Sequence, residues 1–180
     1  MRIPPAGQRP PPQPVSDARP AEPARAPAKA TQAAPVAEKS LSPEQVVTQY
    51  YAAMNARDFG ALEKLYAPNA IFKDNVFHFD NREGIIGMWK KLPEDATVKH
   101  ELLRVDGGDA TTKIAWDYTL FGKKVHNEEE VHLTVRDGRI TAQREKFDFG
   151  KWGHQAFPFL PEKLLDFAEP VMAPLLRMFA

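Results

Sequence analysis

The strongest constraint on the fold is a change in the spacing of apolar residues after Pro93. Apolar and polar residues then alternate in four segments, 98–105, 110–121, 124–135 and 139–147. Such alternation is typical of half-buried strands. The segments are separated by glycine-containing turns at 106–109, 121–123 and 136–138, which suit tight chain reversals. The sequence therefore predicts an antiparallel meander over this half of the chain.

Before Pro93 the apolar residues mostly follow helical spacing. Ser42 and Gln45 form a capping box around Pro43, and apolar residues recur at three- and four-residue steps as far as Met54. A second short helix, capped by Asp58, is predicted to continue to residue 66, and a third over about 80–92, with strands at 70–74 and 76–79 between them. Helices followed by a meander predict an α+β domain over residues 42–156, with a curved, mainly antiparallel sheet wrapped around the helices.

The two flanking segments have a different composition. Residues 1–40 contain ten of the 17 prolines and no aromatic residue, so we expect residues 1–41 to form a disordered tail, with a docking arm as the alternative. Residues 157–180 are strongly apolar, but four prolines and several charged residues interrupt them. A helical extension is predicted there, packed on the domain, in a homodimer or on a membrane surface.

Composition and missing motifs exclude several classes of function. Lysine plus arginine and aspartate plus glutamate balance at 24 each, which argues against a nucleic-acid partner. The absence of cysteine excludes thiol chemistry. No phosphate-binding glycine loop, dinucleotide fingerprint or serine-nucleophile elbow occurs, so no cofactor is expected. Without a secretory signal or a long uncharged apolar run, the chain is expected to be soluble and cytoplasmic, with no transmembrane segment.

The segment IFKDNVF, residues 71–77, places a carboxylate among apolar residues. Asp74, with Phe72 and Val76 on either side, either opens a turn with Asn75 or points into a pocket. In an apolar pocket, desolvation would make its carboxylate a stronger base.

Alternation over residues 124–135 sends Asn127, Glu129 and Val131 to the more apolar face, which we take as the pocket side. Glu129 would then be an alternative acid or base and Asn127 an amide that orients a ligand. The other interpretation is that this strand end forms a solvated edge. The opposite face carries His126, Glu128, Glu130 and His132, whose span of about 20 Å is too long for one ion, so no metal site is predicted.

Aromatic residues supply further candidates for ligand contact. Trp116 and Tyr118 share one strand face, while Trp89, Phe147 and Trp152 lie at the ends of predicted elements. Such a lining suits a flat apolar ligand, although core packing explains the same residues. Asp148 is a further polar candidate beside Phe147.

These elements resemble the nuclear transport factor 2-like superfamily, which includes ketosteroid isomerases and SnoaL-like polyketide cyclases. The resemblance covers residues 42–156 and rests on YYAAMNARDFGALEKLYAPNA, FKDNVFHFDNREGI and RDGRI, and FDFGKWGHQAF is similar to an uncharacterised bacterial branch. It implies a cone-shaped α+β barrel. In the ketosteroid isomerases the matching positions carry the catalytic base, here Asp74, and a tyrosine donor, here Tyr50. Val131 stands where that group has a second acid, and Asn75 where it has proline.

Two hypotheses about function follow from the residues and the resemblance. The first is a cofactor-independent isomerase or cyclase that transfers a proton next to the carbonyl group of a small hydrophobic molecule, with Asp74 as base and Tyr50 as hydrogen-bond donor. The alternative is a non-catalytic module that binds a ligand, or that binds a partner through residues 157–180.

Overall fold

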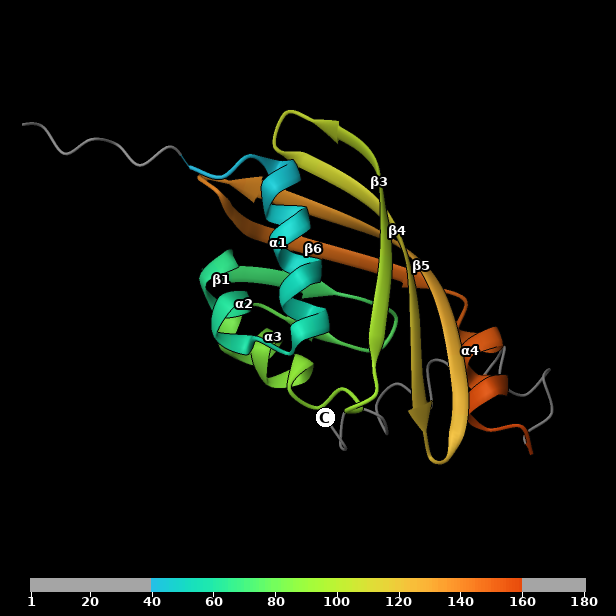
Figure 1. The fold of residues 1–180 in the computed structure, drawn as a ribbon. Helices are drawn as coiled ribbons and strands as arrows, with labels where there is room; N and C mark the ends of the chain where they lie inside the picture. The colour runs from blue at the N-terminus through green and yellow to red at the C-terminus, as the bar shows by residue number, and fades with distance from the viewer. Residues whose placement is uncertain (1–39, 160–180) are drawn as a thin grey trace, which may run out of the picture. The chain divides into compact units, whose positions relative to one another are not determined.

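The computed structural model describes residues 40–159 of the 180-residue chain. The predictions for the segments on either side lie outside these residues. Two helices, α1 (Pro43–Ala56) and α2 (Phe59–Leu65), precede β1 (Tyr66–Lys73), β2 (His78–Phe79) and α3 (Arg82–Trp89). Four long strands follow, β3 (Thr97–Asp106), β4 (Asp109–Leu120), β5 (Lys123–Arg136) and β6 (Arg139–Phe147), and α4 (Phe149–Ala156) ends the series (Figure 1).

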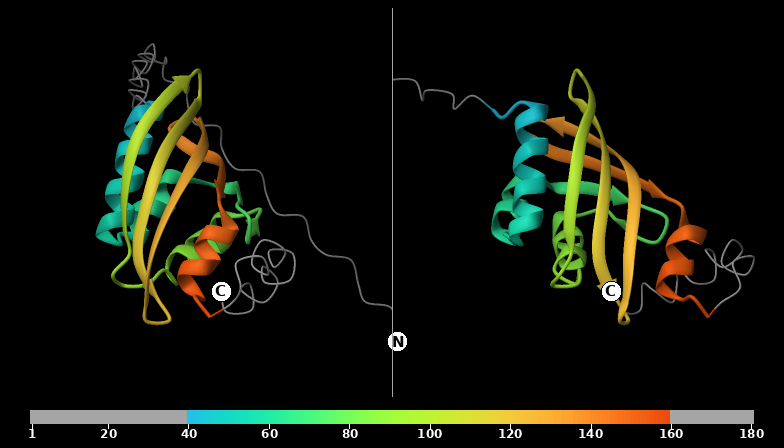
Figure 2. Two further views of the ribbon diagram at one scale, coloured as in Figure 1. Left: turned by 90° about the vertical axis from the view of Figure 1, so that its right-hand side faces the viewer. Right: turned by 45° about the vertical axis from the view of Figure 1, so that its right-hand side comes forward.

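The strands form one mixed sheet in the order β2-β1-β6-β5-β4-β3. Within it only β1 and β6 pair in parallel; the other neighbours are antiparallel. The sheet curves around the α1 side, and α4 lies at the end away from α1 (Figure 2). The predicted α+β fold with a curved, mainly antiparallel sheet is confirmed. The sheet stays open, because its edge strands β2 and β3 do not pair with each other.

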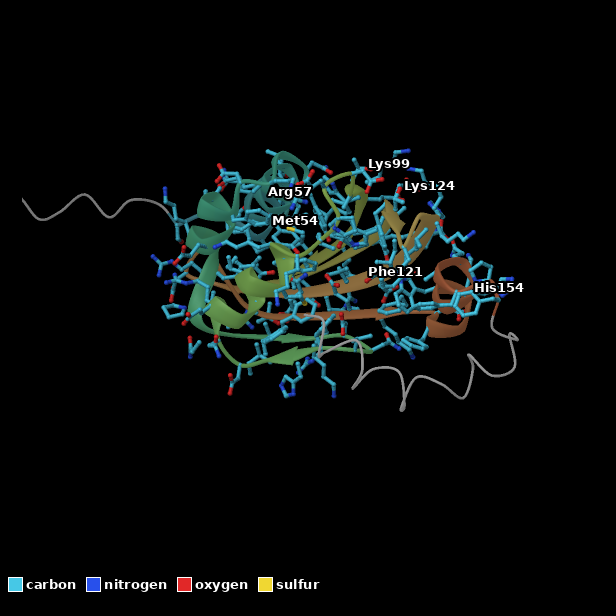
Figure 3. The ribbon with its side chains drawn as sticks, turned by 90° about the horizontal axis from the view of Figure 1, so that it is seen from below. Met54, Arg57, Lys99, Phe121, Lys124 and His154 are labelled. Carbon is cyan, nitrogen blue, oxygen red and sulfur yellow. The ribbon has the colours of Figure 1, made fainter. Side chains whose placement is uncertain are left out.

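The start and end of α1 are fixed by side chains that the sequence reveals. Ser42 and Gln45 form the predicted capping box, and the buried face of the helix carries the predicted apolar residues. Arg57 ends the helix in the left-handed region, with a φ of 52°. Its guanidinium donates to the carbonyl oxygens of Pro93 at 3.0 Å and Leu92 at 3.2 Å. These bonds tie the end of α1 to the loop before β3 (Figure 3, where Arg57 is labelled).

Three predicted boundaries were wrong by a few residues. Tyr66 begins β1 rather than ending the second helix, because its buried hydroxyl bonds to Gln143 on the neighbouring strand β6. The third helix ends at Trp89, and Leu92 lies in the turn that follows it. The strand predicted over 76–79 is reduced to two residues, because the side chain of Asp74 bonds to the backbone N–H groups of Val76 and Phe77.

The helix α4 was not predicted. Asp148 caps it by accepting from the backbone of Lys151 at 2.9 Å, and its apolar residues Phe149, Trp152 and Ala156 form a second small core with Val76 and Val125. Residues 123–128 of β5 extend beyond its pairing with β6. The amide of Gln155 on α4 bonds both the N–H and the C=O of His126 there, at 2.8 and 2.9 Å.

No helix within residues 40–159 is long and apolar enough to cross a membrane.

Candidate active site

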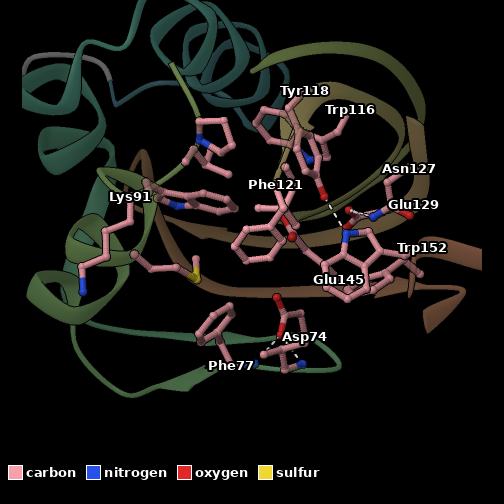
Figure 4. A pocket seen from close by; sticks show the side chains of 17 residues that line it. Asp74, Phe77, Lys91, Trp116, Tyr118, Phe121, Asn127, Glu129, Glu145 and Trp152 are labelled. Carbon is pink, nitrogen blue, oxygen red and sulfur yellow. Dashed lines mark hydrogen bonds between the residues drawn. The ribbon is translucent and has the colours of Figure 1, made fainter. Parts of the chain in front are cut away.

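A cavity of about 250 Å³ lies between the main core and the small core beneath α4. Most of its lining is apolar, and it receives side chains from the turn after β1, from α3, from β4 to β6 and from α4 (Figure 4). Its polar members are Asp74, Asn127, Glu129, Glu145, Tyr118 and Lys91. Three carboxyl groups from three separate chain segments therefore line one mainly apolar space.

Asp74 has both of the roles considered for it. It follows β1 directly, and its Oδ1 accepts from the backbone N–H of Val76 at 2.6 Å and from that of Phe77, so the carboxylate holds the turn in shape. The same side chain lines the cavity and points toward Glu145 (Figure 4). Two backbone donors and a turn of fixed shape thus orient the Asp74 carboxylate toward the cavity.

Glu129 on β5 and Glu145 on β6 are both at least nine-tenths buried, with 8% and 9% of their surface exposed. Strand alternation turns both inward, with Val131 directly opposite Glu145 across the strand pair. An amide holds one oxygen of each: Asn127 donates to Oε1 of Glu129 at 2.7 Å, and Gln143 donates to Oε1 of Glu145 at 2.5 Å. Within the described chain Oε2 of Glu129 has no amide, hydroxyl or backbone hydrogen-bond partner, and the carboxyl groups of Glu129 and Glu145 hydrogen-bond to each other.

Burial makes both glutamates hold their protons more tightly. Desolvation and the charge of Asp74 raise the pKa of Glu129 to about 8, although its side-chain hydrogen bonds with Glu145 and Asn127 lower it. Desolvation, with repulsion from Glu129 and Asp74, raises the pKa of Glu145 well above its usual range. At neutral pH the cavity therefore contains at least one protonated carboxyl group, which can donate a hydrogen bond.

Behind Glu145 lies a buried hydrogen-bond network centred on Gln143. Its Nε2 donates to Tyr50 Oη at 3.0 Å as well as to Glu145, and its Oε1 accepts from the Tyr66 hydroxyl. Trp89 Nε1 donates in turn to Tyr66 Oη at 3.3 Å. Burial raises the pKa of Tyr50 well above its usual value, so its hydroxyl stays neutral. Since Gln143 donates to Oε1 of Glu145, the acidic proton of Glu145 belongs on Oε2.

Aromatic side chains form most of the cavity wall. Trp89 and Trp116 stack with ring centres 6.2 Å apart. Trp152 Nε1 donates to Tyr118 Oη at 2.7 Å, and burial raises the pKa of Tyr118 to about 12. Phe121 lines the cavity although 70% of its surface is exposed, which places it at the mouth. All three tryptophans of the chain line this space.

Most residues singled out in the sequence lie at this cavity. Its lining includes Asp74, Trp89, Trp116, Tyr118, Asn127, Glu129, Phe147 and Trp152. Phe72, Val131 and Tyr50 lie in the core behind it, and Asp148 is an exposed helix cap. Glu145 was missed, although alternation along TAQREKF puts it on the same face as Phe147.

The outer face of β5 carries the histidines and glutamates of the alternating run. His126 pairs with Asp117 at 2.8 Å and His132 with Glu130 at 3.0 Å, all four about half exposed. Among residues 40–159 no group of three histidine, cysteine, aspartate or glutamate side chains is arranged to hold a metal ion.

The sequence profile of the SnoaL-like domain family matches residues 47–143. This chain belongs to the SnoaL-like domain family. The predicted nuclear transport factor 2-like superfamily is thereby confirmed. No curated protein matches the chain in sequence.

Several solved structures share the fold. IdmH from Streptomyces antibioticus, a candidate polyketide cyclase, is 21% identical with a TM-score of 0.57 over 64% of this chain and 98% of its own. An LEH-like epoxide hydrolase from M. tuberculosis is 18% identical, with a TM-score of 0.53 over 71% and 96%. A candidate ketosteroid isomerase from Kribbella flavida is 18% identical, with a TM-score of 0.52 over 59% and 77%. At such identities the likeness concerns the fold alone, so an activity has to be argued from the site.

Proposed function

We propose that this SnoaL-like protein is a cofactor-independent enzyme that moves a proton next to the carbonyl group of a small, mainly apolar molecule. One observation carries the proposal: Asp74, Glu129 and Glu145 line the same apolar cavity. Proton transfer beside a carbonyl needs a base and, on the other side of the substrate, a donor that stabilises the enolate oxygen. We place this activity in the cytoplasm, in line with the absence of cysteine.

We assign the role of base to Asp74 and the role of donor to Glu145. Burial raises the pKa of Glu145, so a protonated carboxyl faces Asp74 across the cavity (Figure 4). In this arrangement the carbonyl oxygen accepts from Glu145 while Asp74 removes a proton from the adjacent carbon and returns it at another. Tyr50 acts only through Gln143, because its hydroxyl bonds to that amide in the core.

The walls of the cavity favour a small substrate. The volume of the cavity, about 250 Å³, lies below the usual range for ligand pockets. It corresponds to the liquid volume of about eight water molecules. Apolar rings around the carboxyls exclude water, which strengthens their interaction with a developing charge.

The proposal can be tested without knowing the substrate. A panel of small ketones is incubated with the protein in heavy water, and NMR follows deuterium exchange at the carbon next to the carbonyl. We expect Asp74→Asn to lower the exchange rate by about a hundredfold or more and Glu145→Gln by about a hundredfold. Glu128→Gln, on the exposed face of β5, is the matched control and should keep the wild-type rate. Wild-type exchange in a folded Asp74→Asn variant would overturn the assignment.

A second candidate is a non-catalytic ligand-binding module. The observation that favours it is the pair of backbone N–H groups bonded to Oδ1 of Asp74, because such bonds stabilise the carboxylate and weaken it as a base. In that case ligands quench the tryptophan fluorescence, yet none of the ketones exchanges deuterium.

A further inference from the structure

Glu129 and Glu145 form a pair of carboxyl groups within the proposed site. Glu129 lies on β5 and Glu145 on β6, and both are buried and line the cavity (Figure 4). Their carboxyl groups hydrogen-bond to each other. Because an ionised carboxylate only accepts hydrogen bonds, this bond requires that at least one of the two groups carries a proton.

Amide donors determine where the protons of this pair lie. Asn127 donates to Oε1 of Glu129 at 2.7 Å, and Gln143 donates to Oε1 of Glu145 at 2.5 Å. The carbonyl oxygen of a protonated carboxyl group is its better acceptor, so the acidic proton of each glutamate belongs on Oε2. Each amide comes from the same strand as its glutamate, two positions earlier, and the sheet therefore holds the arrangement in place.

The number of protons in the pair decides what it can offer to a ligand. With one proton, the protonated group donates to the ionised group and no O–H remains for a ligand. That bond is charge-assisted and about twice as strong as a bond to a neutral acceptor, so a ketone oxygen does not displace it. With two protons, one joins the carboxyl groups and the other can be donated into the cavity.

We propose that the pair binds the carbonyl group of a ligand only when both glutamates are protonated. Glu129 is then a positioning residue: its proton joins the two carboxyl groups and leaves the proton of Glu145 to the ligand. This inference adds regulation by pH to the site. It rests on the proposed function for turnover alone, because it concerns the binding of a carbonyl group.

The surroundings of Glu129 set the pH at which the pair changes. Among the described residues the groups that face it are Asp74 after β1, Glu145 on β6, Tyr118 on β4, Tyr51 on α1 and Asn127 on β5 itself. Burial and the charge of Asp74 raise the pKa of Glu129 to about 8, and burial raises the pKa of both tyrosines, so that they stay neutral. The affinity for a carbonyl ligand should therefore decrease as the pH rises through 8.

Tryptophan fluorescence can measure this affinity on the full chain, because all three tryptophans line the cavity. The probes are cyclohexanone and methylenecyclohexane, in which a CH₂ group replaces the carbonyl oxygen. We expect the affinity for cyclohexanone to fall by about three- to fivefold from pH 6 to pH 9, which corresponds to the loss of one neutral hydrogen bond. The affinity for methylenecyclohexane should stay constant.

The variant Glu129→Gln imitates the protonated glutamate. Its amide can accept from Asn127 and donate to Glu145 without losing a proton, so its affinity for cyclohexanone should not change with pH. Glu128→Gln, on the outer face of β5, is the matched control and should keep the wild-type pH dependence. If Glu129→Gln does not fold, infrared spectra of the wild-type protein provide the test, because the band of protonated carboxyl groups should weaken between pH 6 and pH 9.

Three outcomes would overturn the proposal: the same pH dependence for both probes, a Glu129→Gln variant that keeps the wild-type pH dependence, or a carboxyl band that does not change. Deuterium exchange of ketones together with pH-independent binding of cyclohexanone would leave the proposed function standing and remove this inference. Binding of cyclohexanone that weakens with pH, without exchange of any ketone, would do the reverse.

Discussion

Glu129 and Glu145 retain protons in the folded protein at pH values where an exposed glutamate has lost them. Burial and Asp74 raise the pKa of Glu129 from 4.5 to about 8, whereas the unfolded chain releases this proton near the lower value. Between the two values the native state binds more protons than the unfolded state, so stability falls as the pH rises. We expect the free energy of unfolding, measured with urea, to fall by about 2–3 kcal/mol from pH 6 to pH 9.

The variant Glu129→Gln isolates this contribution. Because glutamine has no proton to lose, the variant should be more stable than the wild type at pH 9, and its stability should change less with pH. Glu128→Gln, half exposed beside Lys113, should follow the wild-type curve. A wild-type protein that becomes more stable between these pH values would contradict the burial of a protonated Glu129.

Gln143 joins the core to the cavity, and its loss should be costly. The substitution Gln143→Leu roughly keeps the volume of the side chain but removes its hydrogen bonds to Tyr50, Tyr66 and Glu145. Each orphaned buried group costs about 1–3 kcal/mol, so we expect a loss of about 3 kcal/mol or more in urea unfolding. Gln49→Leu, on the exposed side of α1, should change stability by less than about 0.5 kcal/mol. Equal stability of the two variants would show that the network contributes little.

The position of a single side chain was predictable where the alternation within one strand determines it. Alternation along β5 placed Asn127 and Glu129 correctly on the cavity side, because the side-chain period of a strand is two. The role of Tyr50 could not be foreseen in this way, because its surroundings depend on Gln143, which lies 93 positions away. Glu145 required the strand pairing as well as the alternation of β6, since only the pairing brings it close to Glu129.

At the level of elements, capping and turn residues predicted most of the structure, and α4 shows where they failed. This helix has two glycines among its eight residues, and glycine is unfavourable in a helix interior. Its stability comes from tertiary contacts, namely the apolar face against Val76 and Val125 and the Gln155 amide on His126. Contacts between distant segments cannot be read from local propensity.

The β4–β5 turn combines an unfavourable residue with a position at the cavity mouth. Phe121 and Gly122 have φ values of 50° and 75°, as in a type I′ turn, which prefers Asn-Gly. A non-glycine residue in this region costs on the order of 1 kcal/mol. We expect Phe121→Asn to raise the free energy of unfolding by about 1 kcal/mol and to weaken the binding of apolar cavity ligands, measured by tryptophan fluorescence.

The matched control for this turn is Asp137→Asn. Asp137 occupies the corresponding position of the β5–β6 turn with a φ of 51°, followed by Gly138. Aspartate already tolerates this conformation, and the turn does not line the cavity, so neither stability nor binding should change. A destabilised Phe121→Asn protein would mean that the ring contact with Phe157, 5.6 Å between centres, outweighs the relief of strain.

On the scale of the whole molecule, the open sheet determines where the cavity forms. The helices α1 to α3 pack against one part of the curved sheet, and α4 packs at the far end of β5. Two apolar clusters result, with the cavity between them. The order of elements predicted the sheet and the first cluster. The second cluster and the position of the cavity depend on how far β5 extends beyond β6, which the sequence does not specify.

The apolar sequence from 160 to 180 makes self-association the last expectation to test. The described chain ends at Phe159, which is 77% exposed, and its ring lies 6.1 Å from that of Phe157. The segment that follows includes Leu164, Leu165 and Phe167. A segment with so many apolar residues is stabilised by burial against a partner, and we expect that partner to be a second copy of the chain.

Analytical ultracentrifugation of three chains would decide this. The full chain and a chain lacking residues 1–39 should sediment as dimers, whereas a chain ending at residue 159 should sediment as a monomer with unchanged tryptophan fluorescence. The fluorescence should persist because all three tryptophans belong to the cavity. A dimer that survives the truncation would place the contact within residues 40–159, and a monomeric full chain that binds lipid vesicles would identify a membrane surface as the partner instead.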